Sequence, residues 1–418
     1  MEKSYIFESG AIRYILDFVK ERNLRRAFIV GDGNTYPLAG DKIRQMLSEV
    51  GTASVAYQFS ASALEPDESA VGSLMLHYDP TCDFIIGIGS GVINDLCKLL
   101  ANVTDKPFII VATAPSMDGY ASPLSSMVRD GLKVSIPTKQ AELIIADFDI
   151  LKNAPARMLK AGIGDMLAKY VSICEWRLGA LITGEGYDAE IADSVRQALK
   201  KCTDNAQGLL KREEAALRAV FEGLVLTGEA MKKAGVSRPA SGAEHYFSHL
   251  WDMRSLAFGT PMDLHGLQCA VATRICVEIY HKLKDLKPDR DKALNYVASF
   301  KLDEWNAALR NFLGNAAEPL INLEAVEKKY DPKKHGPRLD LIIDKYDEIL
   351  AIIDEELPTL ECLDSLYRTL ELPLTPPEAN VLRMTVMAGK DIRDKYVLPR
   401  LLWDLGVLEE FCSEIAEN

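Results

Sequence analysis

The stretch Asp83-Phe-Ile-Ile-Gly-Ile-Gly-Ser-Gly-Val-Ile-Asn-Asp95 places a glycine-rich loop between a short apolar run and a helical pattern that continues to Asn102. The apolar run has the length of a buried strand, and the residues after the loop have helical periodicity. Glycines let the main chain approach a phosphate, and a helix N-terminus offers unpaired N–H groups. A glycine-rich turn alone is a weak signal, but its place directly after a strand favours a phosphate-binding turn.

Strand and helix patterns alternate around this stretch over the first 150 residues. Strand patterns occupy residues 27–30, 54–59, 107–112, 132–137 and 142–146, and helical patterns occupy 12–21, 41–50 and 66–77. Such alternation predicts βαβ units and a parallel sheet, with ligands at the carboxyl ends of the strands.

The rest of the chain has a different pattern. Helical periodicity dominates residues 159–175, 187–211, 215–233, 264–282, 339–354 and 377–388. We therefore expect an α/β dinucleotide-binding domain over residues 1–150 and an all-α, metal- and substrate-binding domain over residues 151–418.

Composition excludes several classes of function. The formal net charge of -13 argues against generic binding to nucleic acids or anionic membranes, so an anionic substrate would need local cationic groups. The 8 cysteines include no C-x-x-C pair, which is typical of reduced thiols in a cytoplasmic protein. The first residues lack a signal-peptide pattern, and no apolar run approaches the ~18 residues of a membrane span.

Two further strand ends carry polar residues. Asp32, in Gly31-Asp-Gly33, can accept hydrogen bonds from the adenosine ribose hydroxyls, and its charge would disfavour the 2′-phosphate of NADP. The alternative is an ordinary Asp-Gly turn. Residues 113–122 form a long polar loop in which Asp118 is a candidate for binding a substrate hydroxyl. Asp95 cannot favour a phosphate by its charge, so we expect it to hold the loop through hydrogen bonds, with Lys98 as its i+3 partner.

Three of the 6 histidines fall in one window. His245 and His249 have i, i+4 spacing and would share one face of a helix, and His265 follows shortly after. Imidazoles with one carboxylate are a common catalytic zinc or iron set, and Asp165 is the candidate carboxylate. The alternatives are three unrelated histidines and an N-cap role for Asp165. We expect the other three, His77, His281 and His335, on the surface.

Five sequence blocks occur in a fixed order and together form a specific signature. They are Gly87-Ile-Gly-Ser-Gly-Val-Ile-Asn-Asp95, Thr113-Ala-Pro-Ser-Met-Asp-Gly-Tyr-Ala-Ser122, Gly164-Asp165, Ser237-Arg-Pro-Ala-Ser-Gly-Ala-Glu-His245 with His249, and Leu264-His-Gly-Leu-Gln268. They resemble the sn-glycerol-1-phosphate dehydrogenase family, within the iron-containing alcohol dehydrogenase and dehydroquinate synthase-like superfamily. Ile392-Arg-Asp-Lys-Tyr396 and Trp403-Asp-Leu-Gly406 resemble its bacterial branch.

The resemblance implies a dehydroquinate synthase-like fold, NAD(P) as cofactor and one divalent metal per subunit, either zinc or nickel, with iron as a further candidate. It implies Asp165, His245 and His265 as metal ligands, and Asp118, Asp165 and His249 as catalytic and substrate-contacting residues. The implied cofactor contacts are Gly91, Val92, Ile93, Asn94, Asp95, Thr113, Ala114, Pro115, Ser116 and Ser122. The loop has Gly-Ile-Gly-Ser-Gly where many relatives have three consecutive glycines.

The implied reaction is hydride transfer between NAD(P)H and dihydroxyacetone phosphate, giving sn-glycerol 1-phosphate, a precursor for phospholipid biosynthesis. The metal would polarise the C2 carbonyl, and His249 or a metal-bound water would supply the proton. Arg238, beside Ser237 and Ser241, is the candidate for binding the substrate phosphate, and a surface arginine is the alternative. A homo-oligomer is expected, with no nucleic-acid partner. The rival functions are a glycerol or other polyol dehydrogenase and a nucleotide-binding protein without catalysis.

Overall fold

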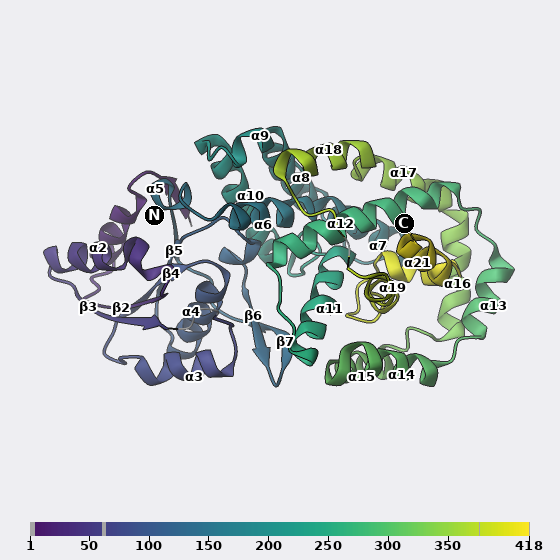
Figure 1. Ribbon diagram of the computed structural model, residues 1–418, viewed down its shortest axis with the longest axis horizontal. Coiled ribbons are helices and arrows are strands. Elements are labelled where there is room, and N and C mark those ends of the chain that lie inside the picture. The colour runs from purple at the N-terminus through teal and green to yellow at the C-terminus, as the bar shows by residue number, and fades with distance from the viewer. Residues whose placement is uncertain (1–4, 61–63, 376, 418) are drawn as a thin grey trace. The chain divides into compact units, whose positions relative to one another are not determined.

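The structure is a computed structural model that describes residues 5–60, 64–375 and 377–417. The chain forms two compact units (Figure 1). The first comprises Met1–Met166 and Gln197–Lys233, and the second comprises Leu167–Arg196 and Ala234–Asn418. The first unit therefore extends beyond the expected boundary at residue 150 and includes helical segments that sequence periodicity alone assigned to the second.

A six-stranded parallel sheet forms the centre of the first unit, which confirms the predicted α/β class. The strand order is β1-β8-β5-β4-β2-β3. The strands are β1 (Tyr5–Glu8), β2 (Arg26–Asp32), β3 (Ala53–Phe59), β4 (Phe84–Gly89), β5 (Phe108–Ala112) and β8 (Leu143–Asp147). After β3 the chain returns to place β4 on the other side of β2, so a topological switch point lies between β2 and β4.

Helices cover both faces of the sheet because its central strands are apolar on both sides. Buried side chains of α1 (Tyr14–Glu21) and α2 (Tyr36–Glu49) join one core cluster with alternate strand residues such as Ile29 and Ile86. The other face carries α4 (Gly91–Thr104), whose Cys97 lies close to Gly87 of β4. Further elements of this unit are α3 (Glu68–His77), α5 (Phe148–Leu151), α6 (Ala156–Leu167), α9 (Ala206–Leu209), α10 (Glu214–Ala234) and the 3-10 turns η1 (Ala11–Arg13) and η2 (Asp118–Tyr120).

The predicted strand at residues 132–137 does not join the main sheet. It is β7 (Leu132–Pro137), which pairs antiparallel with β6 (Leu124–Arg129), a strand that the sequence pattern did not reveal. Asp130 and Gly131 connect the two strands, and both have the positive φ that a tight hairpin turn requires. The short edge strand β1 was also unpredicted.

The second unit is helical, as predicted. Its helices after α7 (Lys169–Thr183) are α11 (Ala243–Phe258), α12 (His265–Lys282), α13 (Arg290–Ala298), α14 (Leu302–Leu313), α15 (Glu318–Glu327), α16 (Pro332–Asp344), α17 (Tyr346–Glu356), α18 (Leu360–Leu370), α19 (Ala379–Ala388), α20 (Leu398–Asp404) and α21 (Leu408–Glu417). The 3-10 turns η3 (Leu283–Asp285) and η4 (Gly314–Ala317) also belong to it, and α8 (Ala189–Asp204) contributes to both units. The predicted single helices 159–175 and 339–354 are each interrupted.

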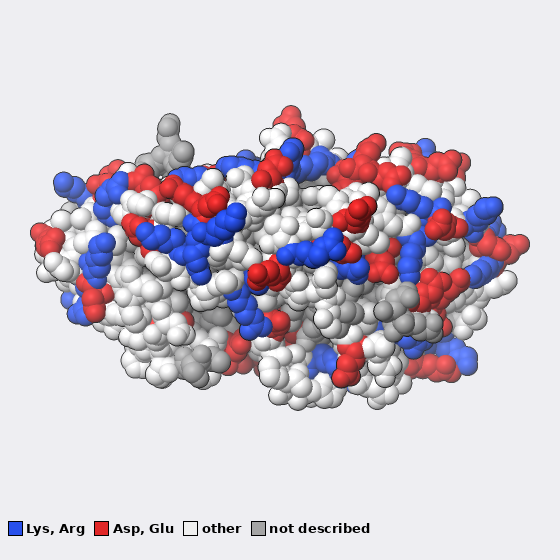
Figure 2. Space-filling view, turned by 45° about the horizontal axis from the view of Figure 1, so that its top comes forward, with Lys and Arg blue, Asp and Glu red and all other residues white. Residues whose placement is uncertain are grey.

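On the face drawn in Figure 2, acidic and basic side chains are interspersed. In the described residues, no helix combines the length and the apolar character needed to cross a membrane. The expectation of a surface position was wrong for His335, which is buried inside the helical unit, where its Nε2 lies 2.8 Å from the Asp404 carbonyl oxygen.

Candidate functional site

The sheet brings the three polar strand ends to one edge. β5, β4 and β2 are neighbours, and all three are parallel, so their carboxyl ends coincide. Asp32 ends β2, Gly89 ends β4, and Thr113 follows β5. The Thr113 N–H donates to the Gly89 carbonyl oxygen at 3.1 Å, and this bond joins the loop after β5 to the loop after β4. This is the edge, at the switch point, where doubly wound sheets bind nucleotides.

The glycine-rich loop leads directly into α4. Its first intrahelical hydrogen bond runs from the Asn94 N–H to the Ser90 carbonyl oxygen at 2.9 Å. The main-chain N–H groups of Gly91, Val92 and Ile93 precede that bond, so they are the groups that a helix start presents to an anion. Because the side chain of Ile93 is buried, this position can serve a cofactor through its main-chain N–H, whereas the N–H of Asn94 is already bonded within α4.

Side chains of α4 hold the polar loop 113–122 in place. Asn94 Nδ2 donates to the Gly119 carbonyl oxygen at 3.1 Å, and Lys98 Nζ donates to the same oxygen at 3.2 Å and to the Leu124 carbonyl. Asp95 accepts a hydrogen bond from the Ser126 N–H and lies 3.5 Å from Lys98 Nζ. Burial raises the pKa of Asp95 and lowers the pKa of Lys98. These contacts agree with a structural role for Asp95.

Other predicted cofactor positions are buried in the same loop, namely Thr113, Ala114, Pro115, Ser116 and Ser122. Asp32 lies at the surface end of β2, where its Oδ1 accepts hydrogen bonds of 2.8 Å from the N–H groups of Asn34 and Thr35. One carboxylate oxygen therefore shapes the turn, as the Asp-Gly alternative requires, and Oδ2 is the oxygen that a ribose hydroxyl would contact.

Asp165 lies inside α6, two residues before its end, so the N-cap alternative is wrong. Its side chain is fully buried, and its Oδ2 accepts a hydrogen bond of 2.9 Å from the Asp118 N–H. The two residues also bring carboxylate oxygens within 4.8 Å of one another. Gly162 makes this approach possible, because a Cβ atom there would overlap the Pro115 carbonyl oxygen.

The three clustered histidines lie on two adjoining helices of the second unit. His245 and His249 are one turn apart on α11, and His265 is the first residue of α12. The His265 ring lies between the other two, with ring centroids 4.9 Å from His245 and 5.8 Å from His249. The structure also brings in Cys269, whose Sγ lies 3.5 Å from His265 Nε2. The i, i+4 spacing from His265 to Cys269 is the signal that could have identified it.

A chain of hydrogen bonds fixes the tautomer of His265. Gln268 Nε2 donates to Asp252 Oδ1 at 3.0 Å, which turns the amide oxygen of Gln268 towards Ser248. The Ser248 hydroxyl donates to that oxygen at 2.6 Å and therefore accepts from His265 Nδ1, 2.9 Å away. His265 thus carries its proton on Nδ1, and Nε2 has the lone pair that a metal needs.

His245 has a similar arrangement. Its Nδ1 lies 2.8 Å from Glu244 Oε1, so Nε2 is again the nitrogen suited to bind a metal. Glu175 of α7 accepts a hydrogen bond of 2.8 Å from the Ala243 N–H and anchors the start of α11. Burial raises the pKa of Glu175 to about 8 and the pKa of Glu244 to about 7.

This donor set fits a divalent transition metal. His245, His265 and Cys269 place one ligand atom each within 4.8 Å of one another. Two oriented imidazole nitrogens and a thiol suit borderline ions such as zinc better than magnesium or calcium.

The structure gives Arg238 defined partners. The guanidinium is buried, with Nε 2.9 Å from Glu185 Oε2, Nη2 paired with Glu185 Oε1, and Nη1 donating to the Tyr396 carbonyl oxygen at 2.9 Å. Arg238 is therefore not a surface arginine, the alternative considered above. It also lines a cavity of the second unit.

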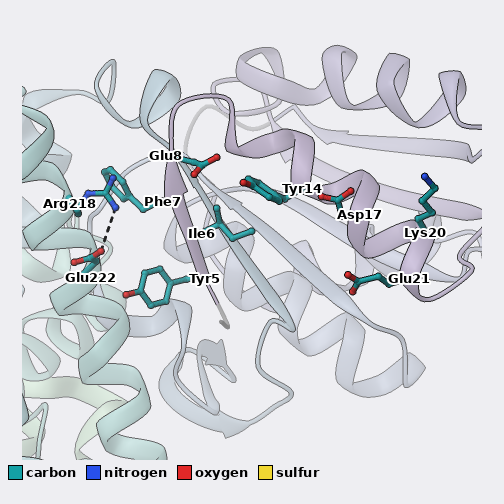
Figure 3. Close-up of a pocket in the computed structure, with 10 residues that line it drawn as sticks. All are labelled: Tyr5, Ile6, Phe7, Glu8, Tyr14, Asp17, Lys20, Glu21, Arg218 and Glu222. Carbon is teal, nitrogen blue, oxygen red and sulfur yellow. Dashed lines mark ion pairs between the residues drawn. The ribbon is translucent and has the colours of Figure 1, made fainter. Parts of the chain in front are cut away.

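A larger cavity, of about 850 Å³, lies in the first unit (Figure 3). It extends along β1 and α1 and is closed on one side by Arg218 and Glu222, which form an ion pair of 3.6 Å. In the described part of the chain, none of the predicted site residues lines it.

Comparison with known proteins identifies the family. Residues 6–155 match the model of the iron-containing alcohol dehydrogenase family. A glycerol-1-phosphate dehydrogenase [NAD(P)+] of Halalkalibacterium halodurans is 34% identical over 274 residues, which are 65% of this chain and 69% of that protein. The chain belongs to the glycerol-1-phosphate dehydrogenase family. The Bacillus subtilis member is 32% identical over 73% of this chain and 79% of its own length, and that of Methanothrix thermoacetophila is 35% identical over 65% and 75%.

Solved structures of the superfamily share the fold. An iron-containing alcohol dehydrogenase from Thermococcus thioreducens superimposes with a TM-score of 0.61 at 14% identity, covering 99% of both chains. A glycerol dehydrogenase from Schizosaccharomyces pombe gives 0.57 at 18% identity, covering 99% of this chain and 90% of that one. At these identities the likeness concerns the fold, which confirms the dehydroquinate synthase-like class expected for the glycerol-1-phosphate dehydrogenase family.

Proposed function

We propose that this protein is a metal-dependent NAD(P)H oxidoreductase that interconverts dihydroxyacetone phosphate and sn-glycerol 1-phosphate. The observation that carries the proposal is the pair His245 and His265, both oriented through Nδ1 so that Nε2 can bind a metal. Membership of the glycerol-1-phosphate dehydrogenase family supports the substrate. The product would supply the glycerol backbone for phospholipid biosynthesis, and we place the reaction in the cytoplasm, in a homo-oligomer.

Asp165, His245 and His265 would hold one zinc, nickel or iron ion. When bound, this ion would polarise the C2 carbonyl of the substrate as a Lewis acid. His249, whose ring stacks on that of His265, would deliver a proton to the C2 oxygen as hydride arrives at C2. Asp118 and Asp165 would contact the substrate, and Arg238 is the proposed cation near its phosphate.

The cofactor would lie at the edge formed by the ends of β2, β4 and β5. The N–H groups at Gly91, Val92 and Ile93 would bind its pyrophosphate, with Asn94 and Asp95 completing the turn. Asp32 would bind the adenosine ribose. The buried loop positions Thr113 to Ser116 and Ser122 would form the floor beneath the nicotinamide half.

An NADH-oxidation assay tests the proposal. The metal-stripped protein is supplied with dihydroxyacetone phosphate or dihydroxyacetone, and zinc, nickel and iron are added back singly. We expect metal-dependent turnover that requires the phosphate. Equal turnover of dihydroxyacetone would support a polyol dehydrogenase instead, and nucleotide binding without turnover under every condition would support a non-catalytic protein.

A further inference from the structure

A cavity of about 520 Å³ in the second unit concentrates positive charge. Among the described residues that line it are nine lysine or arginine side chains and three carboxylates. The chain as a whole has a net charge of -13, so this concentration runs against the charge of the protein. The cations are Arg238, Lys328, Lys329, Lys334, Arg338, Lys390, Arg393, Lys395 and Arg400.

The cavity is built from four segments that are distant in sequence. They are the end of α7 with Glu185, residues 236–238 before α11, residues 327–338 from the end of α15 into α16, and residues 390–400 from the segment after α19 into α20. The last segment includes the sequence block Ile392–Tyr396, to which the proposed reaction assigns no role. The fold therefore gathers cations that the linear sequence disperses over about 160 residues.

Several of these cations have no carboxylate partner. Arg338 forms a two-point ion pair with Asp404. By contrast, the Nζ atoms of Lys329, Lys334 and Lys395 donate to main-chain carbonyl oxygens at 2.5, 2.9 and 2.9 Å. Within the described parts of the chain, none of these three lysines forms an ion pair, so main-chain oxygens and not carboxylates hold their ammonium groups.

Arg400 is a buried cation whose Nε lies 4.0 Å from Asp404 Oδ1. It is 6% exposed, and its Nη2 donates to the Lys329 carbonyl oxygen. Its Nη1 is buried and has no hydrogen-bond acceptor among the described residues. A buried guanidinium N–H without an acceptor is costly, which favours an acceptor supplied by a ligand. Burial, together with Arg238 and Arg393, also lowers the pKa of Lys395 to about 7.

We propose that this cavity binds a small molecule through its phosphate groups. Phosphate oxygens are the acceptors that lysine ammonium and arginine guanidinium groups bind most strongly. The volume is in the range of small-molecule sites. Two sources have this chemistry: the phosphate of the proposed triose substrate and a separate phosphorylated ligand. The proposal rests on the contacts of the cavity and stands whether or not the proposed reaction is correct.

Isothermal titration calorimetry with inorganic pyrophosphate, in a phosphate-free buffer of low ionic strength, tests the site. The test variant is Lys328→Gln/Lys334→Gln, which neutralises two exposed lysines of the cavity and should leave the fold intact. The control is Lys287→Gln/Lys333→Gln, two exposed lysines outside the cavity lining. We expect pyrophosphate to bind the unmodified protein and the control equally, and to bind the test variant about tenfold more weakly.

Absence of pyrophosphate binding to the unmodified protein, or equal affinities in the two double variants, would overturn the proposal. Competition with dihydroxyacetone phosphate distinguishes the sources. If pyrophosphate raises the KM for that substrate, and the test variant loses this effect, the cavity accepts the substrate phosphate. If pyrophosphate binds without changing the KM, the cavity holds a separate phosphorylated ligand. Calorimetry measures pyrophosphate binding directly, so it tests the cavity even if the protein turns over no triose phosphate.

Discussion

Asp165 and Asp118 are joined by a hydrogen bond of 2.9 Å from the main-chain N–H of Asp118 to Oδ2 of Asp165. This bond fixes a fully buried carboxylate on α6 against the loop that carries a second carboxylate. It exists because α6 approaches the Pro115 carbonyl at Gly162, where no side chain intervenes. Two acidic residues, 47 positions apart, are thereby held as one unit.

The close approach at Gly162 predicts that Gly162→Ala is destabilising. The added methyl group meets main-chain atoms that cannot rotate away, and such overpacking costs about 1–3 kcal/mol. Because the loop must move, the bond from Asp118 to Asp165 lengthens and turnover falls as well. Urea unfolding and steady-state kinetics measure both effects.

Gly72→Ala is the matched control. Gly72 lies exposed on α3 with no atom near an added Cβ, so alanine there should stabilise the protein by about 0.5–1 kcal/mol. If both variants gained stability, α6 would not approach the Pro115 carbonyl as closely at Gly162 as the structure shows.

His265→Ala should abolish metal binding while the fold survives. The residue starts α12 and is only partly buried, so its loss leaves the helix packing in place. Turnover should fall about 100-fold or more, since Lewis-acid stabilisation contributes several kcal/mol. Mass spectrometry measures the loss of metal, and circular dichroism shows whether the fold survives. The exposed His77→Ala serves as control, and full metal content in His265→Ala would refute the ligand assignment.

Gln268→Met should weaken metal binding without removing a ligand. Without the amide oxygen, the Ser248 hydroxyl can donate towards His265 Nδ1 and stabilise the wrong tautomer. Loss of such a supporting contact typically costs 10–100-fold in metal affinity, so we expect about that loss. A competition titration with a chelating dye measures it, and the exposed Gln207→Met should match the unmodified protein. Unchanged affinity in Gln268→Met would show that the tautomer of His265 is set elsewhere.

Asp32→Asn should relax discrimination against NADPH. Asparagine retains an Oδ1 acceptor for the N–H groups of Asn34 and Thr35, so the turn survives while the charge is lost. The ratio of kcat/KM for NADPH to kcat/KM for NADH should rise about tenfold, which corresponds to a change of about 1.4 kcal/mol in relative transition-state stabilisation. Asp41→Asn, an exposed change on the adjacent helix, should leave the ratio unchanged. A constant ratio in both variants would leave Asp32 with the turn role alone.

The lowered pKa of Lys395 predicts that the free energy of unfolding depends on pH. Its pKa is lowered to about 7 by burial and by Arg238 and Arg393, against the opposing influence of Glu244 and Glu175. Between pH 7 and about 10.4 the unfolded chain therefore binds more protons at this position than the folded protein does, so the contribution of Lys395 to stability rises with pH. Relative to Lys395→Met, the unmodified protein should gain about 2 kcal/mol between pH 7 and pH 9.

Urea unfolding of both proteins at the two pH values measures this difference. For the exposed Lys333→Met, the difference in free energy of unfolding from the unmodified protein should be the same at both pH values. If this difference is also the same at both pH values for Lys395→Met, then Lys395 keeps an ordinary pKa in the folded state.

The sequence by itself determined the class of the fold and predicted a set of candidate site residues. Hydrophobic runs such as Phe84–Ile88 have the period and length of buried strands, and local chemistry fixes the glycine turn before α4 and the i, i+4 histidine pair on α11. These signals are local, so they are readable without the fold. The hairpin of β6 and β7 and the burial of His335 were missed because each depends on a partner distant in sequence.

Only the tertiary structure decided how the site residues are oriented. The Nδ1 tautomer of His265 depends on Asp252, which acts through Gln268 and Ser248 on two helices. The pairing of Asp165 with Asp118 depends on an empty Cβ position at Gly162. The cationic cavity exists only when four separate segments pack together. Hydrogen-bond direction and charge concentration are properties of contacts in space, and chain order does not encode them residue by residue.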